Sequence, residues 1–225
     1  MFGMIFSRGL KYSLAVAGVT MACVAVSVPQ AHAAAEAKPS FFNSKETKST
    51  NLKPFKKWTG AIERFSKDYN EQKKGDCKEK KMNKCHYKKW MGYLAKLKGK
   101  GQLEIVQAIN ERMNKAKYIT DPNNWGKKDY WATPGEFMAK FGDCEDYAII
   151  KFLSLRMLGF KEEQLRVVAV KDLNLKVGHA ILVVFVEGKT LVLDNQIKQV
   201  IDAKKVRHYQ PVFSISLKSW WRHRV

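Results

Sequence analysis

The sequence predicts an α+β fold in which N-terminal helices pack with a C-terminal antiparallel sheet. Up to about residue 158, apolar residues recur at steps of three and four, which is the period of amphipathic helices. From residue 165 onward the pattern changes to near-continuous apolar, β-branched runs, typical of strands that are covered on both faces. The expected strands cover residues 165–170, 178–186, 190–195 and 209–215.

Residues 1–33 have the pattern of a cleavable signal peptide. Arg8 and Lys11 supply its basic start, residues 14–28 its apolar run, and Ala-His-Ala at 31–33 its cleavage site. An uncleaved membrane anchor is the alternative, but the apolar run is short for a membrane span. We therefore expect export, with cleavage at the end of this segment.

An ordered domain over residues 54–225 is expected after a polar, flexible leader at 34–53. Amphipathic stripes predict three helices whose apolar residues face a core. The stripes are Phe55, Trp58, Ile62, Phe65 and Tyr69 in the first helix, Tyr87, Trp90, Leu94 and Leu97 in the second, and Leu103, Val106, Ile109 and Met113 in the third. A turn-rich segment at 119–135 and a short helix at 136–140 lead to a helix that begins near Cys144.

The chain is strongly basic, with 41 lysines and arginines against 21 acids and a formal charge of +20. Loss of two basic residues with the signal peptide lowers this charge from +20 to +18. Such a charge favours acidic partners, an anionic membrane surface or nucleic acid. No nucleic-acid-binding motif accompanies the lysines, so we expect no nucleic-acid partner. We interpret the charge as a solvated surface that also steers an acidic substrate.

The sequence contains four cysteines, of which Cys23 is lost with the signal peptide. In an oxidising compartment, Cys77 and Cys85 can close a short loop as a disulfide. A metal site is the alternative, although no second ligand pair has suitable spacing. In either case Cys144 is left as a free thiol, and an odd cysteine in an exported protein indicates reactivity.

Cys144 lies in the first turn of its predicted helix. Asp143 is a suitable N-cap, and Asp146 three positions later can complete an acidic variant of the capping box. The helix dipole and the free N–H groups at this end favour the thiolate form of the cysteine. The plainer interpretation is a small buried side chain, which is what most free cysteines are.

A nucleophilic thiol needs a base, and the base needs a group that orients it. His179 lies near the start of one expected strand, and Asp194 lies near the end of the next. In an antiparallel hairpin these two places lie at the same end. A loop of residues 188–189 would nevertheless leave the two side chains four residues out of register, roughly 13 Å apart. We therefore predict that the hairpin turns in another register or contains a bulge.

Four motifs together resemble one known family. They are Asp-Tyr-Trp-Ala-Thr-Pro at 129–134, Gly-Asp-Cys-Glu-Asp-Tyr-Ala at 142–148, Gly-His-Ala at 178–180 and Leu-Asp-Asn at 193–195. Over roughly residues 54–221 the chain is similar to the bacterial transglutaminase-like cysteine proteinases. Within that family it resembles the periplasmic proteases that release large biofilm adhesins from the outer membrane. The resemblance implies a papain/transglutaminase-like fold, with the sheet packed against the helix of the nucleophile.

The resemblance further implies a cysteine endopeptidase with a Cys-His-Asp triad. Cys144 would be the nucleophile, His179 the general base and then the general acid, and Asp194 the group that orients the imidazole. N–H groups near the helix start, including that of Cys144, would hold the oxyanion. Trp131 would assist through its indole N–H, wall the cleft, or serve in packing alone.

Calcium is also implied by the resemblance, and the sequence offers a physical reason for it. Asp143, Glu145 and Asp146 surround the thiol with carboxylates, which oppose thiolate formation. A hard divalent cation binds carboxylate oxygens and would cancel this field. The resemblance indicates Asp143 and Glu145 as ligands, with Asp129 and backbone carbonyls of the 121–131 turns as further candidates. The simpler explanation is that acidic residues favour a helix N-terminus.

The substrate implied by the resemblance is the N-terminal region of a large surface adhesin, cut in the periplasm by a protease that is soluble after signal cleavage. An inner-membrane receptor for cyclic-di-GMP would sequester the protease when this second messenger is abundant. The sequence leaves two other functions open. The same triad could transfer a glutamine amide group, which product analysis with an amine would reveal. A non-catalytic envelope scaffold could instead bind through the basic surface, and it would tolerate Cys144→Ala.

Overall fold

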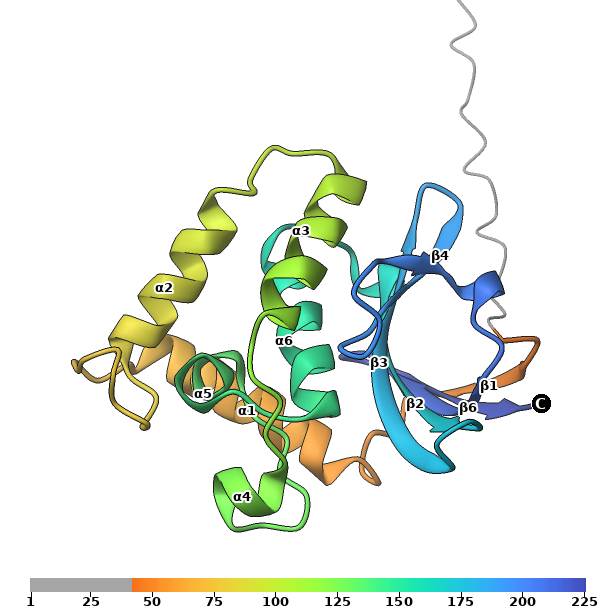
Figure 1. Ribbon diagram of the computed structural model, residues 1–225, viewed down its shortest axis with the longest axis horizontal. Coiled ribbons are helices and arrows are strands. Elements are labelled where there is room, and N and C mark those ends of the chain that lie inside the picture. The colour runs from red at the N-terminus through yellow and green to blue at the C-terminus, as the bar shows by residue number, and fades with distance from the viewer. Residues whose placement is uncertain (1–41) are drawn as a thin grey trace, which may run out of the picture. The chain divides into compact units, whose positions relative to one another are not determined.

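A computed structural model describes residues 42–225, so the predicted signal peptide and the start of the predicted leader lie outside the described residues. The helices are α1 (Lys56–Asn70), α2 (Lys84–Ala95), α3 (Gln102–Asn114), α4 (Asp121–Trp125), α5 (Pro134–Lys140) and α6 (Cys144–Met157). The strands are β1 (Lys45–Ser49), β2 (Leu165–Asp172), β3 (Val177–Val186), β4 (Lys189–Leu193), β5 (Ile201–Asp202), β6 (Tyr209–Ile215) and β7 (Trp220–Arg224). Figure 1 shows the helices on one side of the sheet, which confirms the predicted α+β class.

The strands form one antiparallel, seven-stranded sheet in the order β1-β7-β6-β2-β3-β4-β5. Alternate residues of the central strands enter two separate cores. On β3, Leu182 and Val184 belong to the main core with the helices, whereas Ile181 and Val183 belong to a smaller core on the opposite face. The near-continuous apolar runs of the sequence therefore do mark strands that are covered on both faces.

The helix α6 occupies the centre of the fold, where it packs against β2 and β3 and is covered by α3 and α5. Every residue from Asp146 to Leu155 is buried, so the helix has no solvent-facing side over these turns. A helix that is apolar nearly all round is suited only to the interior. Lys151 departs from this apolar pattern. Its side chain is fully buried, and its Nζ has no hydrogen-bond partner within residues 42–225.

The prediction of a flexible leader over residues 34–53 is wrong for its second half. Residues 45–49 form β1, which pairs with β7 along the edge of the sheet. Glu46 of this strand accepts a hydrogen bond from Arg166 Nη1 at 2.7 Å, with both side chains largely buried. The polar composition that suggested a leader belongs to an edge strand, and such strands commonly carry charged side chains.

The cysteine pair is a disulfide, which decides between the two alternatives left open by the sequence. Cys77 and Cys85 close a loop between α1 and α2. Asn83 caps α2 by accepting the N–H of Cys85 at 2.9 Å, and the N–H of Asn83 donates to His86 Nδ1 at 3.2 Å. Cys144 is the free cysteine among the described residues. None of the helices in this part of the chain has both the length and the apolar character of a membrane span.

Candidate active site

The β3–β4 hairpin brings His179 and Asp194 together. Val186 lies opposite Lys189, so the loop consists of residues 187–188, one residue earlier than the 188–189 loop considered from the sequence. Both loop residues have positive φ, 50° and 70°, as a two-residue turn that matches the strand twist requires. The prediction of another register is therefore confirmed.

The observed register places His179 and Asp194 closer together along the strands than a 188–189 loop would, and their side chains span the remaining distance. Leu193 pairs with Leu182, so Asp194 leaves β4 near the level of Ile181, two residues from His179 on the same face of β3. His179 Nε2 lies 2.9 Å from Asp194 Oδ1, and both side chains are buried. The hydrogen-bonded pair that the sequence predicted is present.

Three donors hold the carboxylate of Asp194. His179 Nε2 and the N–H of Gln196, at 2.9 Å, contact Oδ1, and the Tyr209 hydroxyl donates to Oδ2 at 2.7 Å. Burial alone would raise the pKa of Asp194, but the hydrogen bond and charge of His179, together with Tyr209 and the N–H of Gln196, outweigh burial and hold that pKa below its usual value. Asp194 is therefore a carboxylate that only accepts hydrogen bonds.

The ionised carboxylate determines the tautomer of His179. Because Asp194 accepts from Nε2–H, Nδ1 of the neutral ring is the nitrogen that carries a lone pair. The amide nitrogen of Gln196 lies 3.5 Å from this Nδ1, as a weak donor. Nδ1 is thus the atom that can take a proton from a nucleophile.

Two asparagines of α3 hold the segment that carries Asp194. Asn114 Nδ2 donates to the carbonyl oxygen of Asp194 at 2.6 Å and to that of Ile197 at 3.5 Å. Asn110 Nδ2 donates to the carbonyl oxygen of Lys198 at 3.0 Å. These positioning contacts were not predicted from the sequence, although two polar residues four positions apart beside an apolar helical stripe are a signal for them.

Cys144 begins α6 and faces the first residues of β3. Its Sγ donates to Glu145 Oε2 at 3.1 Å, and no hydrogen bond joins Cys144 to His179 in the described part of the chain. Burial raises the pKa of the Cys144 thiol, and the charge and hydrogen bond of Glu145 and the charge of Asp143 raise it further, while the N–H of Ala180 on β3 acts in the opposite direction. The thiol of Cys144 is therefore protonated. It lies beside β3, which carries His179, but it is hydrogen-bonded to the carboxyl group of Glu145.

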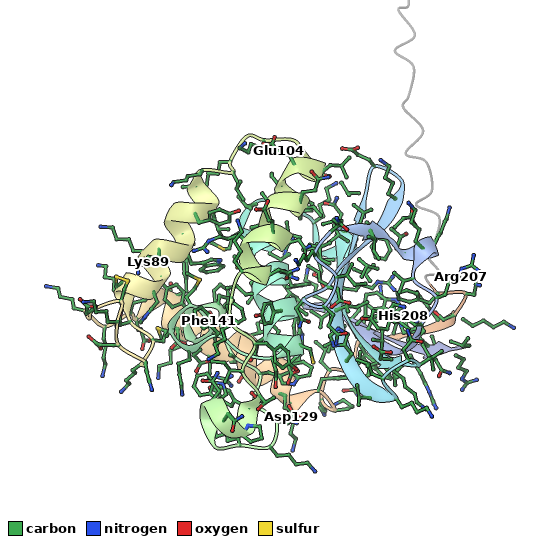
Figure 2. All side chains as sticks on the ribbon, in the orientation of Figure 1. Lys89, Glu104, Asp129, Phe141, Arg207 and His208 are labelled. Atoms are coloured by element: carbon green, nitrogen blue, oxygen red, sulfur yellow. A yellow bond between two sulfur atoms is a disulfide. The ribbon has the colours of Figure 1, made fainter. Side chains whose placement is uncertain are left out.

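A cluster of carboxylates surrounds the start of α6. Oxygens of Asp121, Asp129 and Glu145 lie within 4.8 Å of one another, and Asp143 groups with Asp121 in the same way. Asp129, labelled in Figure 2, lies beside α4 and also forms an ion pair with Lys57. The predicted candidates Asp143 and Asp129 thus each lie near Glu145, and the structure adds the side chain of Asp121, for which only the backbone was predicted as a ligand.

The cluster has the properties of a site for a hard cation. Asp121 Oδ1 and Asp143 Oδ1 are buried without a hydrogen-bond partner among the described residues. Burial, followed by the charge and hydrogen bond of Glu145, raises the pKa of Asp143 to about 7, and burial also raises the pKa values of Asp121 and Glu145. Unpartnered carboxylate oxygens in one place are the ligands that Ca²⁺ prefers, so these residues fit a calcium ion.

Asp146 has a structural role at the same helix start. Its Oδ2 accepts the N–H of Asp143 at 3.3 Å, as expected for the N3 residue of a capping box, and its Oδ1 accepts the N–H of Ala132 at 2.6 Å. A Cβ atom on Gly142 would lie 2.0 Å from Asp146 Oδ2. The glycine of the 142–148 motif therefore makes room for the carboxylate that caps the nucleophile helix.

Two aromatic residues lie near the site. Trp131 is half-buried and packs edge-to-face on Trp58 with a centroid distance of 6.4 Å, so packing is the role that its contacts show. Tyr118, which was not predicted from the sequence as a site residue, is 50 % exposed and stacks on Tyr147. Burial, then the charge of Cys144, raises the pKa of Tyr118, while the backbone of Cys144 acts in the opposite direction.

Comparison with known proteins gives independent evidence on the family and the fold. The family model described as bacterial transglutaminase-like cysteine proteinase, BTLCP, matches residues 68–218. LapG of Legionella pneumophila in its calcium-bound form aligns with a TM-score of 0.57 at 28% sequence identity, over 72% of this chain and 87% of LapG. The EGTA-treated form gives a TM-score of 0.58 at 28% identity, over 73% and 87% of the two chains. No curated protein matches the chain. The chain belongs to the bacterial transglutaminase-like cysteine proteinases and is a cysteine protease with a LapG-like fold.

Proposed function

We propose that Cys144, His179 and Asp194 are the catalytic triad of a calcium-dependent endopeptidase that cuts the N-terminal region of a large surface adhesin. The observation that carries this proposal is the buried His179–Asp194 hydrogen bond. It leaves the lone pair of Nδ1 available on β3, the strand that packs against α6, and Cys144 is the first residue of α6. Membership of a cysteine proteinase family supports the same assignment.

In the proposed reaction, His179 Nδ1 takes the thiol proton, and the sulfur of Cys144 attacks the carbonyl carbon of the scissile bond. Backbone N–H groups at the start of α6, including that of Cys144, stabilise the resulting oxyanion. The C–N bond breaks as the imidazolium gives its proton to the leaving amine, and a thioester remains. Water then attacks the thioester and transfers a proton to Nδ1, and the acid product leaves as the sulfur regains that proton. Asp194 stays ionised and orients the ring throughout.

Calcium fits this reaction through the residues beside the thiol. Asp143 and Glu145 would hold the ion, with Asp129 and Asp121 completing the carboxylate set. A bound cation supplies positive charge that offsets these carboxylates. Glu145, which accepts the thiol proton of Cys144 at 3.1 Å, would be engaged as a ligand in the calcium-bound protein, which would leave the thiol of Cys144 available to His179. The calcium-bound and EGTA-treated forms of the related LapG support the choice of ion.

The cellular setting is part of the same proposal. Residues 1–33 would direct export to the periplasm and be removed, and residues 34–44 would remain as a leader before β1. The likeness to LapG supports a protein substrate. Restraint by an inner-membrane receptor for cyclic-di-GMP is proposed from the resemblance of the sequence motifs alone. The basic surface of the enzyme favours an acidic stretch of chain near the scissile bond.

The test is cleavage of the N-terminal segment of a candidate adhesin by purified residues 34–225. Wild type and Cys144→Ala are compared, each with calcium and with a chelator, and the product termini are determined by mass spectrometry. The expected result is cleavage by wild type in the presence of calcium and in no other sample, with products that carry free carboxyl and amino termini. Cleavage that survives chelation would contradict the role of calcium, and amide-transfer products would contradict hydrolysis.

A further inference from the structure

The segment from residue 73 to residue 100 carries an exceptional charge. It holds eleven lysines, no arginine, and two acids, Asp76 and Glu79, which gives a formal charge of +9 out of +20 for the whole chain. All eleven lysine side chains are exposed. We call them the lysine face: Lys73, Lys74, Lys78, Lys80, Lys81, Lys84, Lys88, Lys89, Lys96, Lys98 and Lys100.

The helix α2 forms the middle of the lysine face. Tyr87, Trp90 and Leu94 are buried on its inner side, and the helix contains no acidic residue. A groove of about 530 Å³ between α2 and α3 is lined by Lys88, Lys89, Lys96 and Arg112, together with Cys85, Gly92 and Tyr93. Figure 2 shows Lys89 on the outer side of the helical layer, away from the sheet.

The two acids in the segment do not neutralise the lysines. Glu79 Oε1 accepts the N–H of Asp76 at 2.7 Å, and Asp76 Oδ1 accepts the N–H of Lys78 at 2.7 Å, so both carboxylates serve the loop backbone. Among residues 42–225, Lys100 is the one member of the lysine face with an ion-pair partner, Glu104. Within the described chain, ion pairs therefore leave ten of the eleven lysines without a direct acidic partner.

This arrangement of charge does not stabilise the fold. Lys84 is the first residue of α2, and further lysines precede it in the loop that leads into the helix. The N-terminus of a helix carries a partial positive charge, so cations there are unfavourable. The Cys77–Cys85 disulfide keeps this loop closed at the helix start, against the repulsion of its like charges. A local arrangement that costs stability is the pattern expected of a functional surface.

The chemistry of the face distinguishes between kinds of anionic partner. Protein interfaces are enriched in aromatic residues, methionine and arginine and are depleted in lysine. The lysine face has no arginine of its own, and no large apolar side chain is exposed between residues 73 and 100. Lysines on flexible stems are compact point charges that suit a diffuse negative surface, and an anionic bilayer attracts each of them.

We propose that the lysine face docks the protein reversibly on an anionic phospholipid bilayer. The contact is electrostatic, because the face has no apolar anchor to insert among acyl chains. Figure 1 shows α2 on the outside of the helical layer, with α3 and α6 between it and the sheet. Docking through α2 therefore leaves the candidate site between α6 and β3 uncovered.

Sedimentation with vesicles tests the proposal. The purified processed protein is mixed with vesicles of phosphatidylcholine alone, or of an equal mixture with phosphatidylglycerol. A fourfold variant, Lys84→Gln, Lys88→Gln, Lys89→Gln and Lys96→Gln, is compared with a matched control, Lys161→Gln, Lys189→Gln, Lys204→Gln and Lys205→Gln. The control removes the same charge from exposed positions outside the face.

We expect wild type to bind the vesicles that contain phosphatidylglycerol and not those of phosphatidylcholine alone. It should be released at about 1 M salt, where the Debye length is about 3 Å. The face variant should bind at least about 100-fold more weakly, and the control should lose far less. Unchanged near-ultraviolet circular dichroism shows that both variants are folded. Equal loss in the two variants, binding that survives high salt, or no binding by wild type would overturn the proposal. Binding of an acidic peptide but not of vesicles would overturn it in favour of a protein partner.

Discussion

Tyr209→Phe removes one hydroxyl from the centre of the candidate site and leaves the rest of the side chain in place. In wild type this hydroxyl donates to Asp194 Oδ2 at 2.7 Å. The ring, which packs against His179 at a centroid distance of 5.6 Å and against His208 at 4.2 Å, is retained. The substitution thus isolates one charge-assisted hydrogen bond to the group that orients His179.

The expected loss follows from the burial of the acceptor. Asp194 is 1 % exposed, so water cannot replace the lost donor at Oδ2. A hydrogen bond to a charged group contributes about 1.5–3 kcal/mol, and we expect the free energy of unfolding to fall by that amount at neutral pH. For a domain of this size the melting temperature should fall by roughly 3–12 °C.

The pH dependence gives a second, independent expectation. The pKa of Asp194 in the folded protein lies below the usual 3.8, so its stabilising contribution is complete above that value and is lost as pH falls through the lower, folded pKa. Tyr209→Phe removes one cause of the lowered pKa of Asp194. The difference in unfolding free energy between wild type and variant should therefore have its largest value near pH 7 and become smaller below about pH 4.

Denaturation in urea at a series of pH values measures both quantities, and Tyr93→Phe is the matched control. The Tyr93 hydroxyl donates to the carbonyl oxygen of Ala108 at 2.8 Å, a neutral acceptor in the helical layer. Its loss should cost about 0.5–1.5 kcal/mol, with no narrowing in acid and no effect on peptide cleavage. The reasoning is refuted if Tyr209→Phe costs no more than Tyr93→Phe, or if its cost does not change between neutral and acid pH.

Three further predictions follow from buried groups. Burial lowers the pKa of Lys151 from 10.5 to about 7, so the folded protein binds fewer protons than the unfolded chain between these values. Lys151→Met should therefore raise the unfolding free energy by about 1–4 kcal/mol below pH 7, with a gain that shrinks towards pH 10.5, and a loss of stability at every pH would contradict this. Gly142→Ala should destabilise the protein by about 1–3 kcal/mol in thermal unfolding and reduce cleavage, because the new Cβ overlaps the carboxylate of Asp146, and wild-type stability would argue against that close contact. Calcium should raise the melting temperature of wild type and raise it much less in Asp121→Asn, whereas equal shifts would exclude Asp121 as a ligand.

The features that could be predicted from the sequence have local signals. The apolar runs of β2 and β3, the acidic start of α6 and the separate motifs around Cys144, His179 and Asp194 are each readable within a short stretch. The separation of His179 and Asp194 that a 188–189 loop would cause could also be predicted, because the rise per residue of a strand gives that separation as a distance. These signals were sufficient for the fold class and for the residues of the candidate triad.

The features that could not be predicted depend on contacts between distant segments. β1 is polar and pairs with the last strand of the chain, so its own sequence does not distinguish it from a leader. Asp121 lies 22 residues before Asp143, its hydrogen-bond partner, and Tyr209 lies 15 residues beyond Asp194. Strand β1, Asp121 and Tyr209 thus each gain their role from contacts made in the folded protein rather than from their neighbours in sequence.

The most direct test of the proposed mechanism is a mass measurement of the enzyme during turnover. Wild type, Cys144→Ala and His179→Ala are mixed with the adhesin segment and calcium, quenched in acid within the first turnover, and digested for mass spectrometry. The account predicts that the peptide containing Cys144 in wild type gains the mass of the acyl fragment, as a thioester, and that neither variant shows this adduct. Cleavage by Cys144→Ala, or an adduct on another residue, would contradict it.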